Sequence, residues 1–119
     1  MLYELNNRSI MLEPLLNSKN KENILFFLTA NNDGYPREIA KFYGSDISPI
    51  QNQLEKLEYG NVITSKLVGR TRVYSFNPRY PFLKELKTIL QKAIDFLPND
   101  KKKRLLLVRK RPRRKGKPL

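Results

Sequence analysis

Residues 45–60 read SDISPIQNQLEKLEYG, and this stretch contains the most informative helix signals in the chain. Ser48, Pro49 and Gln51 have the pattern of a capping box, in which a serine caps the helix and a glutamine three residues later reaches back to the serine N–H. Apolar side chains follow at i, i+4 and i+7 spacing: Ile50, Leu54 and Leu57. This spacing predicts a helix over residues 48–59 with one buried face.

The residues before this stretch predict two further helices. Ser18 offers an N-cap to a helix over residues 19–30, which carries an apolar stripe. Residues 31–34 (NNDG) end that helix, because these residue types tolerate turn and left-handed conformations. Pro36 then opens a short helix at its first position, where the missing N–H costs nothing, and Gly44 ends it.

The residues after this stretch predict a β-hairpin and then a long helix. Residues 62–76 are rich in β-branched and aromatic side chains, as strands prefer. Gly69 and Arg70 interrupt them with the pattern of a two-residue turn that has Gly at its first central position. Residues 81–97 have the clearest helical period in the chain, and Pro98 ends it. The predicted fold class is therefore mostly α with a small β-hairpin, that is, α+β.

The predicted helix over residues 48–59 presents a polar face outward once its apolar stripe is buried. Asn and Gln can bond bidentately to adenine N6 and N7, and Lys reaches guanine or phosphate. Glu55 also faces outward, but a carboxylate repels phosphate, so it is not a predicted contact. The predicted DNA contacts are Ser48, Gln51, Asn52, Gln53 and Lys56. The alternative interpretation is an ordinary solvent-facing helix.

The predicted hairpin carries two arginines at or beside its tip. Arg70 and Arg72 are two residues apart, so they share a face on an extended strand. Such a tip can contact backbone phosphate or enter a narrow minor groove. Arg70, Thr71 and Arg72 are therefore predicted DNA contacts. The alternative is plain surface charge that serves solubility.

The predicted helix over residues 81–97 has nine apolar positions in seventeen, more than one covered face of a small domain requires. The simplest use of the surplus is the same helix of a second copy, an isologous homodimer contact. The predicted interface residues are Phe82, Leu86, Ile89, Leu90, Ala93, Ile94 and Leu97. Full burial inside one monomer is the alternative.

The net charge is concentrated at one end of the chain. The 119 residues carry 24 Lys plus Arg against 11 Asp plus Glu, a net charge of +13. Residues 98–119 alone carry 11 basic side chains and one acidic one, or +10. This gradient predicts a polyanionic partner. Composition of this kind buries little apolar surface, so this tail is predicted to be largely disordered, except for the apolar run 105–108.

Residues 12–97 resemble the winged helix-turn-helix transcriptional regulators of the ArsR-like and MarR-like kind. Three segments carry the resemblance: 35–40 (YPREIA), 48–58 (SPIQNQLEKLE) and 68–74 (VGRTRVY). The resemblance implies double-stranded DNA binding as a homodimer, with the second helix of the motif in the major groove. ArsR-type sensors detect metals through Cys or His, and because this chain has neither, metal sensing is not predicted.

The end of the tail is similar to another DNA-binding peptide. Residues 115–118 (KGKP) resemble the Arg-Gly-Arg-Pro core of the AT-hook, with Lys where that family has Arg. Lys lacks the flat guanidinium that fits the narrow minor groove. The tail is therefore interpreted either as a phosphate-binding segment or as a minor-groove peptide. The predicted contacts are Arg113, Arg114, Lys115 and Lys117.

The composition also excludes several classes. The chain has no Cys, which excludes disulfides, and no His, the commonest general base and metal ligand. No paired-acid motif or phosphate-binding glycine loop is present, so neither catalysis nor a cofactor or metal is predicted. No secretory signal and no apolar run of spanning length are present, so the protein is expected to be cytoplasmic and away from membranes.

The predicted organisation has four parts: an arm or short helix (1–17), the DNA-binding domain (18–80), the dimerisation helix (81–97) and the basic tail (98–119). Two other functions stay open. An RNA-binding or ribosome-associated role would use the same charge, although the chain lacks RNP-type aromatic platforms and a GXXG loop. A protein-interaction module would use the winged helix to hold a partner chain.

Overall fold

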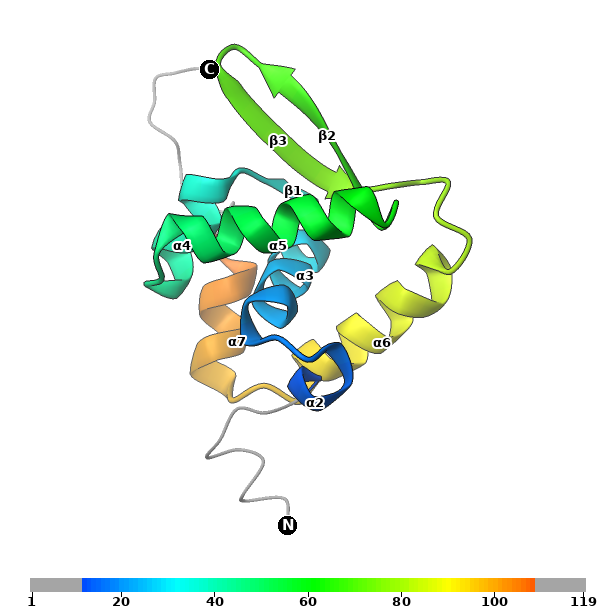
Figure 1. The fold of residues 1–119 in the computed structure, drawn as a ribbon. Helices are drawn as coiled ribbons and strands as arrows, with labels where there is room; N and C mark the ends of the chain where they lie inside the picture. Colours follow the sequence, from blue (N-terminus) through cyan, green and yellow to red (C-terminus); the bar gives the residue numbers. More distant parts are fainter. Residues whose placement is uncertain (1–11, 109–119) are drawn as a thin grey trace.

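The computed structural model of the chain describes residues 12–108 (Figure 1). In this range the protein has six helices and a three-stranded antiparallel sheet, which confirms the α+β class. The helices are α2 (Glu13–Leu16), α3 (Lys19–Asn31), α4 (Pro36–Tyr43), α5 (Ile47–Tyr59), α6 (Leu83–Asp95) and α7 (Asn99–Leu106). The strands are β1 (Asp33–Gly34), β2 (Ile63–Val68) and β3 (Thr71–Phe76).

Helix α3 lies at the centre of the molecule. Its N-cap is Ser18, whose hydroxyl accepts a hydrogen bond from the Lys21 N–H at 3.0 Å, so the predicted cap is confirmed. The residues from Ile24 to Leu28 are all buried, because α2, α4, α5, α6 and α7 pack around the helix. A helix that is apolar on all sides needs neighbours on all sides. Helix α3 is therefore buried on more sides than the single apolar stripe predicted for residues 19–30.

Strand β1 is an element that the sequence did not predict. Asp33 and Gly34 pair with Ser75 and Tyr74, which makes β3 the central strand of the order β1-β3-β2. A Cβ on Gly34 would lie 2.9 Å from Cε1 of Phe27, so only glycine allows this close approach to α3. The residues predicted as a turn therefore also form the third strand.

Helices α4 and α5 are joined by a short link. Pro36 is the first residue of α4, and Gly44 ends it in the left-handed conformation, with φ 65°, as predicted. Helix α5 begins at Ile47 with Asp46 as N-cap, so the predicted capping box at Ser48 is wrong. Pro49 is tolerated at the third helical position because the first four N–H groups of a helix have no partner within it.

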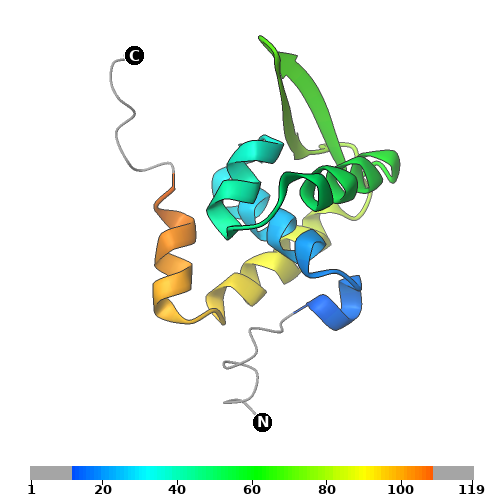
Figure 2. The same cartoon turned by 60° about the vertical axis from the view of Figure 1, so that its left-hand side comes forward.

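The predicted hairpin is confirmed and projects from the body of the protein. Val68 pairs with Thr71 across a two-residue turn, in which Gly69 has φ 65°. Its base is buried through Ile63 and Phe76, whereas the residues near the tip are exposed. The tip points away from α6 and α7 in both views of the ribbon (Figures 1 and 2).

The first part of the basic tail forms a helix, and its buried residue belongs to the apolar run 105–108 that was excepted from the predicted disorder. Helix α7 (Asn99–Leu106) packs on α3 and buries Leu105, which is 2% exposed. The Asn31 side-chain N–H₂ donates to the Leu105 carbonyl at 3.5 Å, and the Arg104 guanidinium lies 5.4 Å from the ring centre of Phe42. Burial of Leu105, the hydrogen bond from Asn31 and the contact of Arg104 with Phe42 keep this highly charged segment packed on the body of the protein.

We expect Leu105→Ala to lower the free energy of unfolding by about 2 kcal/mol or more, because a buried leucine is truncated in a packed site. Leu106→Ala is the matched control. Leu106 is 41% exposed, so its truncation should cost less than about 0.5 kcal/mol. Urea unfolding measures both changes. Equal, small effects of the two substitutions would show that α7 does not pack on α3 in solution.

Candidate nucleic-acid interface

The polar face predicted for residues 48–59 lies on the surface of α5. Ser48, Gln51, Asn52 and Lys56 are all exposed. Helix α5 crosses the front of the molecule in Figure 1, with α3 behind it and no element of the described chain over it. The helix therefore presents hydroxyl, amide and ammonium groups together along one side.

Gln53 is the exception among these residues. It is half-buried, and its side-chain Oε1 is enclosed without a hydrogen-bond partner in the described part of the chain. The reason is its position three residues after Ile50 and four before Leu57, both of which are buried. Gln53 therefore lies at the edge of the buried stripe, and its carbonyl oxygen does not face outward as predicted.

A hydrogen-bond chain connects α5 to the hairpin. Arg72 Nη1 donates to Ser65 Oγ at 3.0 Å, and Ser65 Oγ donates to Glu58 Oε2 at 2.7 Å. Burial, followed by the negative charge of Glu58, raises the pKa of the neighbouring Tyr74, so its hydroxyl stays neutral. The two hydrogen bonds fix the hairpin relative to the C-terminal half of α5. They also engage one of the five N–H donors of Arg72 within the protein.

The tip of the hairpin is solvent-exposed, as predicted. Arg70, Thr71 and Arg72 are all exposed, and Arg70 lies in the turn itself. Lys66 on β2 is exposed as well, so the structure adds a cation that the sequence analysis missed. The alternation of side chains along β2 could have indicated it: Ile63 is buried on one face of the strand, so Thr64 and Lys66 lie on the opposite face.

The residues predicted for a dimer interface on and beside α6 differ in their exposure. Leu90, Ala93 and Ile94 are buried within the single chain, because α3 packs on this side of α6, which corresponds for these three to the alternative of burial inside one monomer. Leu86 and Leu97 are half-buried. The exposed apolar residues of this region recur every seven positions and form what we name the outer stripe: Phe82 (63% exposed), Ile89 (46%) and Phe96 (63%). Phe96 was not among the predicted residues.

The predicted contacts in the basic tail lie outside the described residues. Arg113, Arg114, Lys115 and Lys117 belong to the segment after residue 108, so the structure gives no position for them. Within residues 12–108, no His, Cys, Asp and Glu side chains gather in a group of three or more that could hold a metal ion. No helix of that range is both long and apolar enough to cross a membrane.

Comparisons with known proteins add no assignment. A scan against protein-family models finds no match to this chain, and a search of the curated proteins finds none. The protein has an α+β fold. Helix α5, which carries the exposed polar face, is joined to the arginine-tipped hairpin by the hydrogen bonds Arg72–Ser65 and Ser65–Glu58.

Proposed function

We propose that this protein binds double-stranded DNA sequence-specifically, as a homodimeric winged-helix transcriptional regulator. The observation that carries the proposal is the exposed amide-bearing face of α5 beside a projecting hairpin with Arg70 at its tip. In this proposal α5 enters the major groove, where Gln51 and Asn52 read base edges. The hairpin contacts the backbone or the minor groove.

The order of the elements supports this proposal. Helix α4, a link of three residues and helix α5 are followed directly by the β2–β3 hairpin. This order is consistent with the winged helix-turn-helix family that residues 12–97 resemble. The 13 residues of α5 give a helix about 20 Å long, and a major groove about 12 Å wide admits a helix. The dipole at its N-terminus favours nearby phosphate.

The outer stripe of α6 supports the homodimer. Ile89 lies on α6, and Phe82 and Phe96 are its N-cap and C-cap residues, so an exposed apolar row extends along the whole helix. Glu85 and Lys92 are also seven residues apart, each three positions after a stripe residue, and both are exposed. In a two-fold antiparallel pair, Glu85 of each copy therefore faces Lys92 of the other. An apolar seam flanked by opposite charges fits a second copy of the same chain.

Selection of duplexes from a random library tests the proposal most directly. We expect the protein to enrich a two-fold site whose halves lie about 34–36 Å apart, or a multiple of that distance. Structured RNA at the same salt concentration serves as competitor. Enrichment of no sequence, or stronger competition by RNA than by unrelated duplex DNA, would contradict sequence-specific DNA binding and favour an RNA-binding role.

The basic tail should contribute affinity and little discrimination. Residues 109–119 contain seven basic side chains, and each phosphate that they neutralise adds about 0.9 to the slope of log K against log salt. We expect a chain truncated after residue 108 to show a flatter salt dependence and an unchanged base preference. Affinity measured over a salt series with selected and scrambled duplexes checks both. Loss of a preference for A·T-rich sites would instead support the minor-groove interpretation of the tail.

A second candidate function is protein–protein interaction through the hairpin. Leu67 and Val68 near its tip are adjacent and 61% and 55% exposed, and contiguous exposed apolar surface is a feature of protein-interaction sites. The polar face of α5 is also close to neutral, since Lys56 is offset by Glu55 and Glu58. Co-purification of a stoichiometric partner that is lost in Leu67→Glu and retained in Gln51→Ala would support this function over DNA binding.

A further inference from the structure

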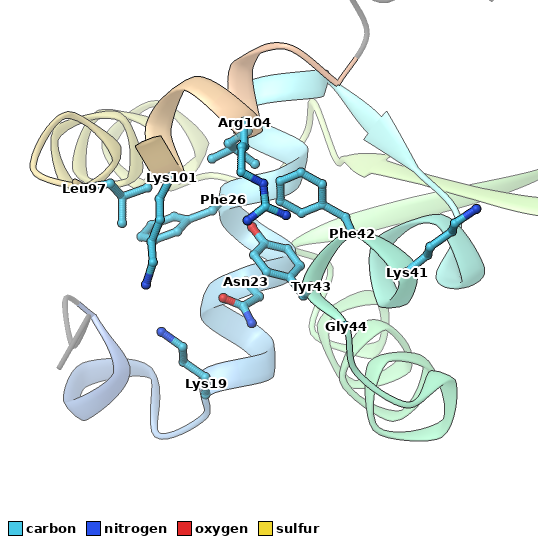
Figure 3. A pocket seen from close by; sticks show the side chains of 11 residues that line it. Lys19, Asn23, Phe26, Lys41, Phe42, Tyr43, Gly44, Leu97, Lys101 and Arg104 are labelled. Carbon is cyan, nitrogen blue, oxygen red and sulfur yellow. The ribbon is translucent and has the colours of Figure 1, made fainter. Parts of the chain in front are cut away.

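A cavity of about 510 Å³ lies between α3, α4 and α7, away from the polar face of α5 and the hairpin tip (Figure 3). It exists because α7 folds back over α3, the feature that composition did not predict. The volume lies within the roughly 300–1,000 Å³ that small-molecule sites occupy. Nothing in the proposed DNA contacts uses this space.

The charged side chains that line the cavity are all positive. Lys19, Lys101 and Arg104 direct their charged ends toward it, whereas the ammonium of Lys41 points away (Figure 3). Lys19 is ion-paired with buried Glu22 at 3.3 Å, but Glu22 does not itself line the cavity. The lining therefore contains four cationic residues and no carboxylate, which favours an anion.

Apart from Asn23 and Gly44, the rest of the lining is aromatic and aliphatic. The rings of Phe26 and Phe42 lie at the cavity, and the Arg104 guanidinium is placed over the ring of Phe42 at 5.4 Å. Leu97 and Leu105 complete the apolar part. A flat ring is well suited to contact such side chains and the face of a guanidinium. The cavity thus offers an aromatic surface next to cations.

Tyr43 supplies a hydrogen-bond donor that has no acceptor. Its hydroxyl is enclosed and has no hydrogen-bond partner among the described residues, and in Figure 3 it points toward the guanidinium of Arg104. Burial, followed by the negative charge of Glu22, raises the pKa of Tyr43 above its usual range, so the hydroxyl stays protonated. A buried donor without an acceptor is costly, and an anion at this position would satisfy it.

We propose that this cavity binds a small molecule in which an aromatic ring carries one anionic group. The ring lies against Phe26 and Phe42, and the anion accepts hydrogen bonds from Arg104, with Lys101 beside it. The Tyr43 hydroxyl donates to the same group after a small movement of Arg104. Aromatic carboxylates and nucleoside monophosphates both have this chemistry.

Titration of the ¹⁵N-labelled full chain, followed by amide chemical shifts, tests the proposal. The probes are 2-naphthoate and adenosine monophosphate, each with a neutral counterpart, 2-naphthalenemethanol and adenosine. We expect saturable binding of at least one anion, with shifts at Tyr43, Gly44 and Leu105. The neutral counterpart should bind about tenfold more weakly, the effect of one lost charge-assisted hydrogen bond. Which anion binds distinguishes the two ligand sources.

Four single substitutions test the location of the site. Arg104→Met and Lys101→Met should each weaken binding of the anion, the first by about tenfold. Lys41→Met is the matched control, because it removes a cation from the same lining whose ammonium points away, and it should leave binding unchanged. Thermal unfolding of each variant confirms that α7 stays docked. Tyr43→Phe, which removes only the hydroxyl, provides a variant that keeps the Phe42–Arg104 contact.

The proposal is overturned if neither anion binds saturably, if the neutral counterparts bind equally well, or if the shifts map to α5 and the hairpin. It is also overturned if Lys41→Met weakens binding as much as Arg104→Met. The readout contains no DNA, so this proposal and the proposed DNA binding succeed or fail independently.

Discussion

Replacing Gln51 and Asn52 together with alanine is expected to lower the affinity for the selected DNA site by about hundredfold or more. Each amide that bonds bidentately to adenine contributes about 1–3 kcal/mol of discrimination, and about 1.4 kcal/mol is a factor of ten in affinity. Both side chains are exposed on α5, so the substitutions remove base contacts without opening the core. Affinity for a scrambled duplex should stay the same, because phosphate contacts come from other residues.

Fluorescence anisotropy with the selected and the scrambled duplex, at one salt concentration, measures both affinities. Gln91→Ala is the matched control, since Gln91 is an exposed amide on α6 whose side-chain N–H₂ donates to Asp95 Oδ1 at 3.2 Å. It should change neither affinity. An equal loss on both duplexes would mean that α5 contributes general attraction and reads no bases. An unchanged affinity would exclude α5 as the reading helix.

Local signals in the sequence were sufficient for much of the fold. Ser18 caps α3, Pro36 opens α4, and Gly44 ends it, because each residue type meets a requirement of one helix end. Gly69 likewise sets the hairpin turn through its own positive φ. These features depend on neighbours within a few residues, which the sequence displays directly.

The features that were missed depend on residues distant in the sequence. Strand β1 forms because β3, some forty positions later, offers a free edge, and because Gly34 fits against Phe27. Helix α7 extends back to residue 99, beyond the apolar run 105–108 that was expected to pack, and Leu105 of that run packs on α3. A prediction of disorder from composition averages over the whole segment, so one buried side chain does not change it.

In the candidate interface, too, features set by neighbouring residues were predictable, and features set by residues distant in the sequence were not. The outward direction of Asn52 followed from helical periodicity and was correct. Gln51 and Gln53 were expected on the flanks of the helix; Gln51 is exposed, whereas Gln53 borders the buried stripe and encloses its carbonyl oxygen. The bond from Ser65 to Glu58 joins a strand to a helix, and no spacing rule predicts it. The cavity beside Tyr43 is assembled from three helices, so it had no signal in the sequence at all.

The second large effect is expected for the outer stripe of α6. Ile89→Glu should convert the proposed homodimer to a monomer, because two carboxylates would meet at the two-fold axis without a partner. Ile89 is 46% exposed in the single chain, so the monomer itself should remain folded. Two linked half-sites bind about 10²–10⁴-fold more tightly than one. The affinity for the two-fold DNA site should therefore fall by about hundredfold or more.

Sedimentation equilibrium gives the mass, and anisotropy with one half-site gives the affinity that each monomer retains. Leu106→Glu is the matched control, because it places the same charge at an exposed leucine on another helix, where it should leave both mass and affinity unchanged. If Ile89→Glu still sediments as a dimer, the copies meet through another surface. If the unaltered chain is a monomer, the proposed homodimer is wrong. Loss of the dimer with full affinity for one half-site is the result that assigns α6 to pairing and α5 to reading.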